Sequence, residues 1–154
     1  MKYLLPILIL FCSTPASADD QDDCLSKDAS MNACEFARAL QKSLAPQLPM
    51  QMSASMTIDT VSATGRLLTI VGVWHYTKDE VSTMIGEKGE TLDDLSKAIT
   101  AYGKNYACSA NIVRSFIDNR GQLQQILRTS DGFVLSVSTV EDCTDAPEKP
   151  PAQQ

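Results

Sequence analysis

The placement of the cysteines constrains the fold of this chain more than any other feature, because a disulfide ties two separate segments together. The sequence holds five cysteines, and Cys12 lies in an N-terminal segment that we expect to be removed. The remaining four are an even number, which in an exported protein indicates two disulfides. Four cysteines permit three pairings. These four residues are Cys24, Cys34, Cys108 and Cys143.

A zinc site is the alternative use of four cysteines, and their spacing disfavours it. Structural zinc sites use closely spaced pairs such as C-x-x-C, or histidine partners. The sequence has no such pair, and His75 is its only histidine. We therefore assign the cysteines to disulfides and expect neither a metal nor a cofactor.

The first residues have the order of features that is typical of a secretory signal peptide. Lys2 supplies a positive charge, and residues 3–11 form an apolar run. The run is shorter than the about 20 residues that a transmembrane helix needs. Small residues at 16–18 predict cleavage after Ala18. This order favours a signal peptide over a buried N-terminal helix, and we expect the mature protein to be periplasmic.

The sequence predicts neither a lipid anchor nor a nucleic-acid partner. Lipoproteins place a small residue before the modified cysteine, whereas Phe11 precedes Cys12 and Asp23 precedes Cys24. The formal net charge of −6 repels phosphate backbones. No basic amphipathic segment is present to bind anionic lipid. We therefore expect no stable membrane anchor and no nucleic-acid partner.

Hydrophobic periodicity predicts an α+β fold. A capping box from Asn32 to Glu35 opens a helix whose apolar residues recur at three- and four-residue spacing. Alternating residues later predict strands, and Asp131-Gly132 predicts a hairpin turn. We expect a four-stranded antiparallel sheet made of two hairpins, with two main helices packed on one face, in the order α-β-β-α-β-β. The expected elements are helix 33–44, strands 52–58 and 67–76, helix 92–108, and strands 122–129 and 133–143, with weaker helical patterns in 78–89 and 112–117.

The helix at 92–108 has the clearest start. Thr91 can cap it, and Asp93 and Asp94 lie in the first turn, where the helix dipole favours carboxylates. We expect its apolar stripe to be buried against the sheet. This stripe is Leu92, Leu95, Ala98, Ile99, Tyr102 and Tyr106.

These elements suggest one domain and favour one disulfide pairing. We expect a signal peptide at 1–18, an acidic arm at 19–30, a single α+β domain at 31–143 and a disordered tail at 144–154. A Cys24–Cys34 bridge would hold the arm against the start of the first helix. A Cys108–Cys143 bridge would join the end of the long helix to the end of the last strand. This pairing is favoured over the other two.

No constellation of residues indicates catalysis. His75 lies between Trp74 and Tyr76 in an apolar strand, where a lone histidine is more often structural than a base. Asp93 and Asp94 are explained by helix capping. We expect a protein that is not an enzyme. Trp74 and Tyr76 are candidate partner-binding residues, because aromatic side chains often dominate interfaces, although core packing is the alternative.

The layout resembles the small type II secretion pilotins of the GspS-beta/AspS type. The similarity lies in a first helix that ends near Gln47-Leu48-Pro49, a helix that closes on Ala107-Cys108, and a last hairpin that ends in Val140-Glu141-Asp142-Cys143. Pilotins of this type bind the C-terminal segment of a secretin and carry it to the outer membrane by means of an N-terminal lipid. The context of Cys12 and Cys24 departs from the family there. The resemblance supplies no partner-binding residue.

Three classes of function stay open. The first is a non-catalytic, pilotin-like accessory or adaptor that binds a component of an envelope or secretion assembly. The second is a periplasmic immunity protein or inhibitor that neutralises a toxin acting on the cell wall or membrane, because an acidic surface can steer onto a basic enzyme. The third is an exported enzyme. The resemblance to pilotins favours the first class.

Overall fold

A computed structural model describes Cys24 and residues 32–144 of this chain. The predicted signal peptide with its cleavage site after Ala18, the arm other than Cys24, and the tail beyond Thr144 lie outside the described residues. The elements are α1 (Ala33–Leu44), the 3-10 helix η3 (Ala45–Gln47), β1 (Met50–Ser53), β2 (Met56–Thr64), β3 (Leu67–Trp74), α2 (Lys78–Gly86), α3 (Leu92–Ser109), α4 (Asn111–Asp118), β4 (Gln122–Thr129) and β5 (Val134–Val140).

The α+β class is confirmed, and the predicted sheet is wrong in two details. The sheet has five strands in the order β1-β2-β3-β4-β5, because the first predicted strand turns back at Ala54 and forms two strands. The predicted hairpins are β2–β3 and β4–β5, but β3 and β4 are parallel. The helical connection α2–α3–α4 explains this pairing, since it returns the chain to the starting end of β3 before β4 begins.

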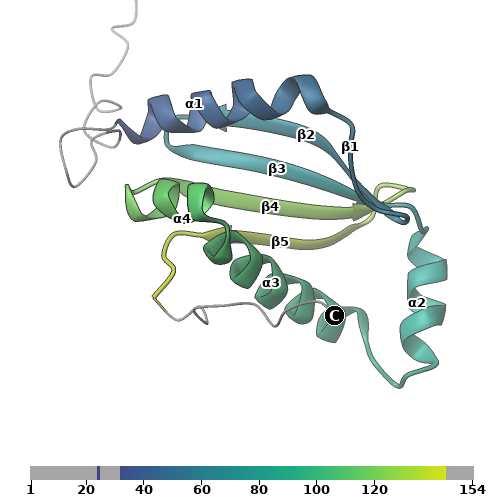
Figure 1. Cartoon of the computed structure of the whole chain (residues 1–154). Coiled ribbons are helices and arrows are strands. Elements are labelled where there is room, and N and C mark those ends of the chain that lie inside the picture. The colour runs from purple at the N-terminus through teal and green to yellow at the C-terminus, as the bar shows by residue number, and fades with distance from the viewer. Residues whose placement is uncertain (1–23, 25–31, 145–154) are drawn as a thin grey trace, which may run out of the picture.

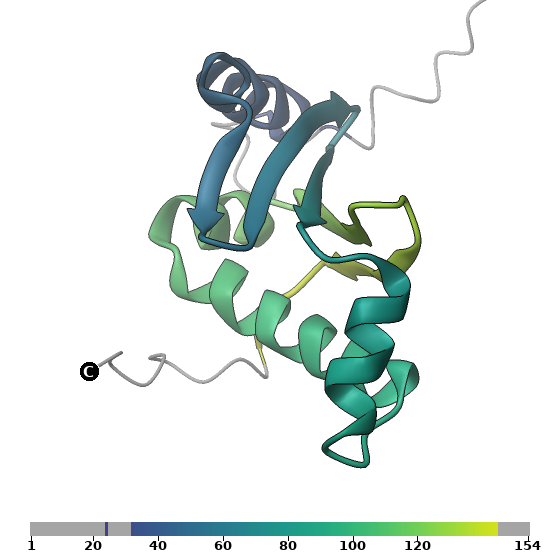
Figure 2. The ribbon, with the colours of Figure 1, turned by 90° about the vertical axis from the view of Figure 1, so that its right-hand side faces the viewer.

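The described residues form four α-helices, since the weaker helical patterns at 78–89 and 112–117 correspond to α2 and α4 beside the two expected main helices, and three of the four lie on one face of the sheet. Figure 1 shows α1 alongside β2, α3 running obliquely past β5, and α4 near the start of β4, and α1 also contacts β3 and α4. The remaining helix, α2, stands at the end of the sheet beyond β3 (Figure 2). Among the helices of the described residues, none is long and apolar enough to cross a membrane. The helices therefore cover the two margins of one sheet face.

The core lies where α1, α4 and the end of α3 meet the sheet. Phe116 of α4 has no exposed surface, and Phe36 of α1 packs edge-on against it with ring centroids 5.4 Å apart. Leu68 of β3 and Leu123 of β4 are paired in register and are also buried. This cluster closes one end of the helix-covered face.

Both disulfides join a helix of the core to a neighbouring segment. Cys24 is bonded to Cys34 in the first turn of α1, and Cys108 in the last turn of α3 is bonded to Cys143 after β5. These are the two pairs that the predicted elements favour. The second bridge lies in the core, since Cys108 and Cys143 are both buried. It fixes the end of α3 to the margin of the sheet.

Gly121 gives a prediction about the packing of this core. A Cβ at this position would overlap the ring of Phe116, which is fully buried and cannot move aside without displacing its neighbours. We expect Gly121→Ala to lower the free energy of unfolding by about 1–3 kcal/mol, the usual cost of overpacking. Urea denaturation measures this change. Gly86→Ala is a matched control, because a Cβ at Gly86 meets no atom within 4 Å and Gly86 does not have a positive φ. An equal effect of both substitutions would contradict the packing argument.

Candidate partner-binding groove

A groove of about 590 Å³ lies on the helix-covered face, between α3 and the middle strands. Its floor comes from β2, β3, β4 and β5, and the turn between β1 and β2 closes one side. None of the described residues that line it is charged. Its lining includes Ser55, Met56, Ile58, Ile70, Gly72 and Trp74 on one side and Ala98, Ile99, Tyr102, Gly103 and Tyr106 of α3 on the other, with Gln125, Leu127, Ser136 and Ser138 between them.

Strand alternation places the floor residues together. Ile70, Gly72 and Trp74 occupy alternate positions of β3, so they face the same side of the sheet. Gly72 is paired with Leu127 on one neighbour and with Ile58 on the other. A Cβ on Gly72 would come within 3.1 Å of Leu127 Cδ1. The glycine therefore leaves room for large apolar side chains around it on the floor.

The prediction that the apolar stripe of α3 is buried is wrong for most of its length, because α3 forms an exposed wall of the groove. Tyr102 is 64% exposed and Tyr106 is 53% exposed, and their rings stack with centroids 6.3 Å apart. Within α3 only Ala107 and Cys108 are buried. The reason is geometric, because α3 meets the core only at its last turn. Four residues of the predicted stripe, Ala98, Ile99, Tyr102 and Tyr106, line a groove that no described element fills.

Gly103 and Gln125 hold this wall at its distance from the floor. Gln125 Nε2 of β4 donates a hydrogen bond of 3.2 Å to the carbonyl oxygen of Gly103. A Cβ on Gly103 would overlap Gln125 Oε1, so glycine permits the close approach. Together with the Cys108–Cys143 bridge and the Lys104–Asp142 ion pair of 3.4 Å, this contact attaches the second half of α3 to the sheet and to the segment after β5.

Of the two predicted partner-binding residues, Trp74 lines the groove and Tyr76 does not. Trp74 lines the groove, and its Nε1 lies 3.4 Å from Ser55 Oγ. Tyr76 packs edge-on against Trp74 with ring centroids 5.7 Å apart, outside the groove lining. His75 is exposed, and its Nε2 lies 3.4 Å from Thr57 Oγ1. Contact of Trp74 and Tyr76 with a partner stays a prediction.

Sequence reasoning missed Tyr102, Tyr106 and Ile99 as site residues. Their helical spacing indicates an apolar face, but spacing does not say what covers that face. A weak signal was present in the residue types, because tyrosine is amphipathic and is enriched at interfaces. Two tyrosines one turn apart on a stripe otherwise made of aliphatic residues are consistent with an exposed wall.

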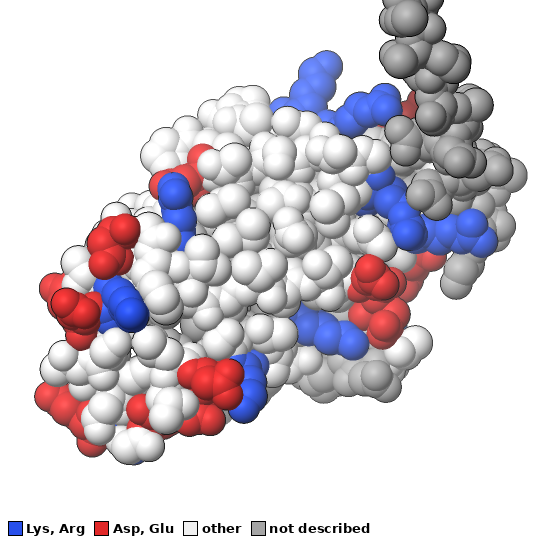
Figure 3. Space-filling model, turned by 180° about the vertical axis from the view of Figure 1, so that it is seen from behind, with Lys and Arg blue, Asp and Glu red and all other residues white. Residues whose placement is uncertain are grey.

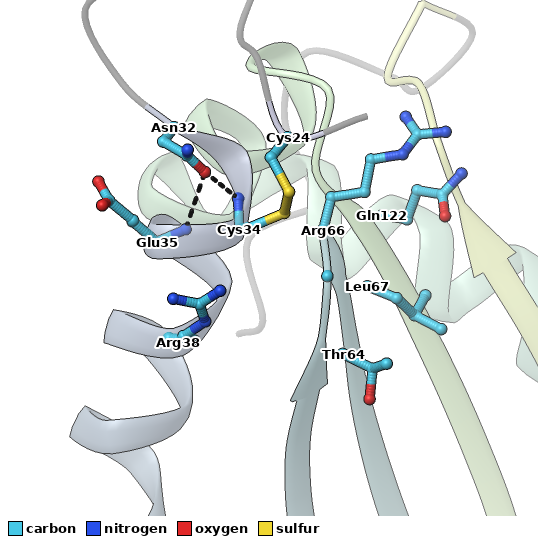
Figure 4. A pocket seen from close by; sticks show the side chains of 10 residues that line it. Cys24, Asn32, Cys34, Glu35, Arg38, Thr64, Arg66, Leu67 and Gln122 are labelled. Atoms are coloured by element: carbon cyan, nitrogen blue, oxygen red, sulfur yellow. Dashed lines mark hydrogen bonds between the residues drawn. A yellow bond between two sulfur atoms is a disulfide. The ribbon is translucent and has the colours of Figure 1, made fainter. Parts of the chain in front are cut away.

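A second cavity of similar volume lies beside the Cys24–Cys34 disulfide (Figure 4). Asn32 Oδ1 caps α1 there by accepting from the backbone N–H groups of Cys34 and Glu35. Arg38 and Arg66 also line it, but Figure 4 shows their guanidinium groups on different sides of the disulfide. Since these charges do not converge, this cavity is a weaker candidate than the groove.

On the opposite face of the sheet lies no helix from residues 32–144. Figure 3 shows an uncharged central area there, with charged side chains around it. By register, Val71, Ile126 and Val137 lie side by side on neighbouring strands of this face. Val137 is 57% exposed. This face supplies control positions for experiments on the groove.

Two capping boxes hold ionised carboxylates at the starts of α2 and α3. Glu80 Oε2 accepts from the backbone N–H of Thr77 at 2.7 Å, and this bond holds the pKa of Glu80 below its ordinary value of 4.5. Asp94 Oδ2 accepts from Thr91 Oγ1 at 2.6 Å, and this bond holds the pKa of Asp94 below its ordinary value of 3.8. Both helix starts therefore carry negative charge at neutral pH.

The capping boxes give a prediction about pH. A carboxylate whose pKa is lower in the folded state adds stability above its ordinary pKa, and that stability is lost as the pH falls through the folded value. We expect the first turns of α2 and α3 to lose amide protection as the pH falls from about 4.5 towards these lowered pKa values. Amide hydrogen exchange measures the loss of protection, and NMR titration of Glu80 and Asp94 measures their pKa values. Thr91→Ala should return the pKa of Asp94 towards 3.8, and an unchanged pKa would contradict the assignment.

No protein-family model and no curated protein matches the sequence. Three solved structures are similar to this chain. EpsS, a pilotin of the Vibrio vulnificus type II secretion system, has a TM-score of 0.56 and 12% identity over 88% of this chain and 100% of that chain. AspS, a type II secretion pilotin of Vibrio cholerae, has a TM-score of 0.51 and 14% identity over 80% of this chain and 93% of that chain.

The third structure is a Pseudomonas aeruginosa protein described as secreted. It has a TM-score of 0.55 and 8% identity over 71% of this chain and 88% of that chain. Identities this low establish the fold alone. The chain therefore has the fold of type II secretion pilotins, and the resemblance predicted from the sequence is confirmed at the level of the fold.

Proposed function

We propose that this chain is an exported, non-catalytic protein-binding module that serves as a pilotin-like accessory of an envelope or secretion assembly. Its compartment is the periplasm, after removal of residues 1–18. The single observation that carries the proposal is the uncharged, largely apolar groove whose α3 wall stays exposed. A large apolar face left open on a small domain is typical of a binding site for another protein.

The fold supports the same function. The two pilotins with this fold belong to type II secretion systems. Binding of a secretion component is therefore the role that fold and groove support together. The context of Cys12 and Cys24 does not favour lipidation, so the accessory acts without a stable anchor of its own.

The groove supports binding rather than catalysis. Its lining holds hydroxyl, amide and apolar groups, and no described residue among them is a carboxylate, an imidazole or a thiol. General acid–base and nucleophilic catalysis usually draw on those groups. These groups suit binding of a partner through buried apolar surface and complementary shape.

Cross-linking in intact cells, followed by purification of mature residues 19–154 and mass spectrometry, tests the proposal. Capture of a secretin or another assembly subunit, lost in a variant whose groove carries Tyr102→Glu, is the expected result, because Tyr102 lines the groove and is exposed. Capture of one toxic hydrolase whose activity is lost in the complex would replace the accessory role with that of an immunity protein.

A further inference from the structure

The two ends of the groove differ in their surroundings. On the floor, the positions before Ile70 and Gln125 on the same face are Leu68 and Leu123, which are buried in the core. The groove therefore ends there against packed side chains. At the other end, the groove residues Trp74 and Ala98 adjoin two helices along the chain. Residues 75–77 connect Trp74 to α2, and the first turns of α3 come before Ala98. Figure 2 shows α2 and the start of α3 at this end of the molecule.

The bordering segment, residues 78–97, is acidic. Glu80 and Asp94 are held ionised by their capping boxes, and Asp93 is paired with Lys97 at 2.6 Å. The ammonium group of Lys78 lies over the ring of Phe133. The carboxylates of the segment outnumber its lysines. They are Asp79, Glu80, Glu87, Glu90, Asp93 and Asp94, against Lys78, Lys88 and Lys97.

Some of these carboxylates are free to meet a partner. Asp79, Glu87 and Glu90 are exposed and form no ion pair with another described residue. Figure 3 shows acidic side chains gathered at this end of the molecule. Unpaired carboxylates beside an uncharged groove create a local field that favours cations.

The groove favours an uncharged segment of a ligand, and the acidic border favours a basic residue next to that segment. A charged side chain placed in the uncharged groove would lose hydration without gaining a partner, which is costly. A basic residue that extends from the groove at the α2 end would instead meet the free carboxylates of α2 and of the loop that joins α2 to α3. We propose that the groove takes a segment of another protein in which uncharged apolar residues adjoin lysine or arginine, with the basic residues placed against α2 and the start of α3.

This inference rests on the proposed function and names the chemistry of the segment that the groove binds. Charges at the rim of an interface act mainly on the rate of association and on its salt dependence, whereas buried apolar contacts set much of the affinity. The acidic border therefore favours apolar segments that are followed or preceded by basic residues over those next to acidic or neutral residues. It also orients the segment, because only one end of the groove has this border.

Three synthetic peptides test the inference on the mature protein. All share one uncharged amphipathic helix of leucine, alanine, serine and glutamine, and they end in a lysine tail, a glutamate tail or a glycine–serine tail. Trp74 is the only tryptophan of the chain and lines the groove, so its emission reports occupancy. We expect the lysine peptide to bind about three- to tenfold more tightly than the neutral one at low salt. The difference should disappear near 1 M salt, where the Debye length is about 3 Å.

Two charge-reversal variants separate the border from the overall charge. Glu87→Lys with Glu90→Lys should remove the preference for the lysine tail. The matched control, Glu35→Lys with Asp118→Lys, changes the net charge equally on α1 and α4 and should leave the preference intact. Equal affinity for all three peptides, or an equal effect of both variants, would overturn the inference and leave the groove as a docking site. If no peptide alters Trp74 emission, both the inference and the groove as the binding site are wrong.

Discussion

Tyr102→Ala combined with Tyr106→Ala is expected to weaken binding of the captured partner at least about 30-fold, or about 2 kcal/mol. The two stacked rings form the exposed wall of the groove, and aromatic side chains at the centre of an interface supply much of its binding energy. Because both rings are exposed in the free protein, the free energy of unfolding should change by less than about 1 kcal/mol. Calorimetry with the partner, together with urea denaturation, measures the two quantities.

Val134→Ala combined with Val137→Ala is the matched control. These side chains are 49% and 57% exposed, and neither lines the groove. The control should leave the Kd within about twofold of the unsubstituted protein, as expected for positions outside the interface. If the valine pair weakens binding as much as the tyrosine pair, the partner does not bind in the groove.

Removal of the Cys108–Cys143 disulfide is expected to have the largest effect on stability. The bridge closes a loop with a sequence separation of 35, and its loss as Cys108→Ala with Cys143→Ala should cost about 3–4 kcal/mol on the loop-entropy model. The same change releases the end of α3 from the sheet, so we expect partner binding to weaken as well. Urea denaturation under oxidising conditions measures the stability, and calorimetry measures the binding.

The other disulfide supplies the comparison. Cys24–Cys34 has a sequence separation of 10, for which the same model gives about 2–3 kcal/mol. It lies beside the start of α1, away from the α3 wall. Cys24→Ala with Cys34→Ala should therefore lower stability and leave the Kd unchanged. Loss of binding in this variant, or retained binding without the α3 bridge, would contradict the role assigned to the Cys108–Cys143 bond.

The sequence predicted the parts of the fold that depend on local signals. The capping residues Asn32 and Thr91 mark the starts of α1 and α3, and the turn at Asp131-Gly132 marks the β4–β5 hairpin. The short hairpin between β1 and β2 was missed because its turn, Ser53-Ala54-Ser55-Met56, contains neither glycine nor proline. The parallel pairing of β3 with β4 depends on the path of three helices and has no local signal.

The groove was beyond sequence reasoning for a related reason. The stripe that includes Ile99, Tyr102 and Tyr106 shows that one face of α3 is apolar, but a stripe has the same spacing whether the chain or a partner covers it. Whether it is covered depends on the distance between α1 and α3 across the sheet. The position of α3 is held by the Gly103–Gln125 contact and by the Cys108–Cys143 bond, which join residues far apart in the sequence. Trp74 was singled out from its type alone, and the structure places it on the groove floor.

Site-specific photo-cross-linking in the cells that make this protein is the most direct test of the groove as the partner-binding site. A photo-reactive phenylalanine analogue at Tyr102 lies on the exposed wall of the groove, and the same analogue at Val137 lies on the opposite face. We predict a cross-link from position 102 to a component of an envelope or secretion assembly and none from position 137. A cross-link to that component from position 137, with none from position 102, would show that the groove is not where this protein binds its partner.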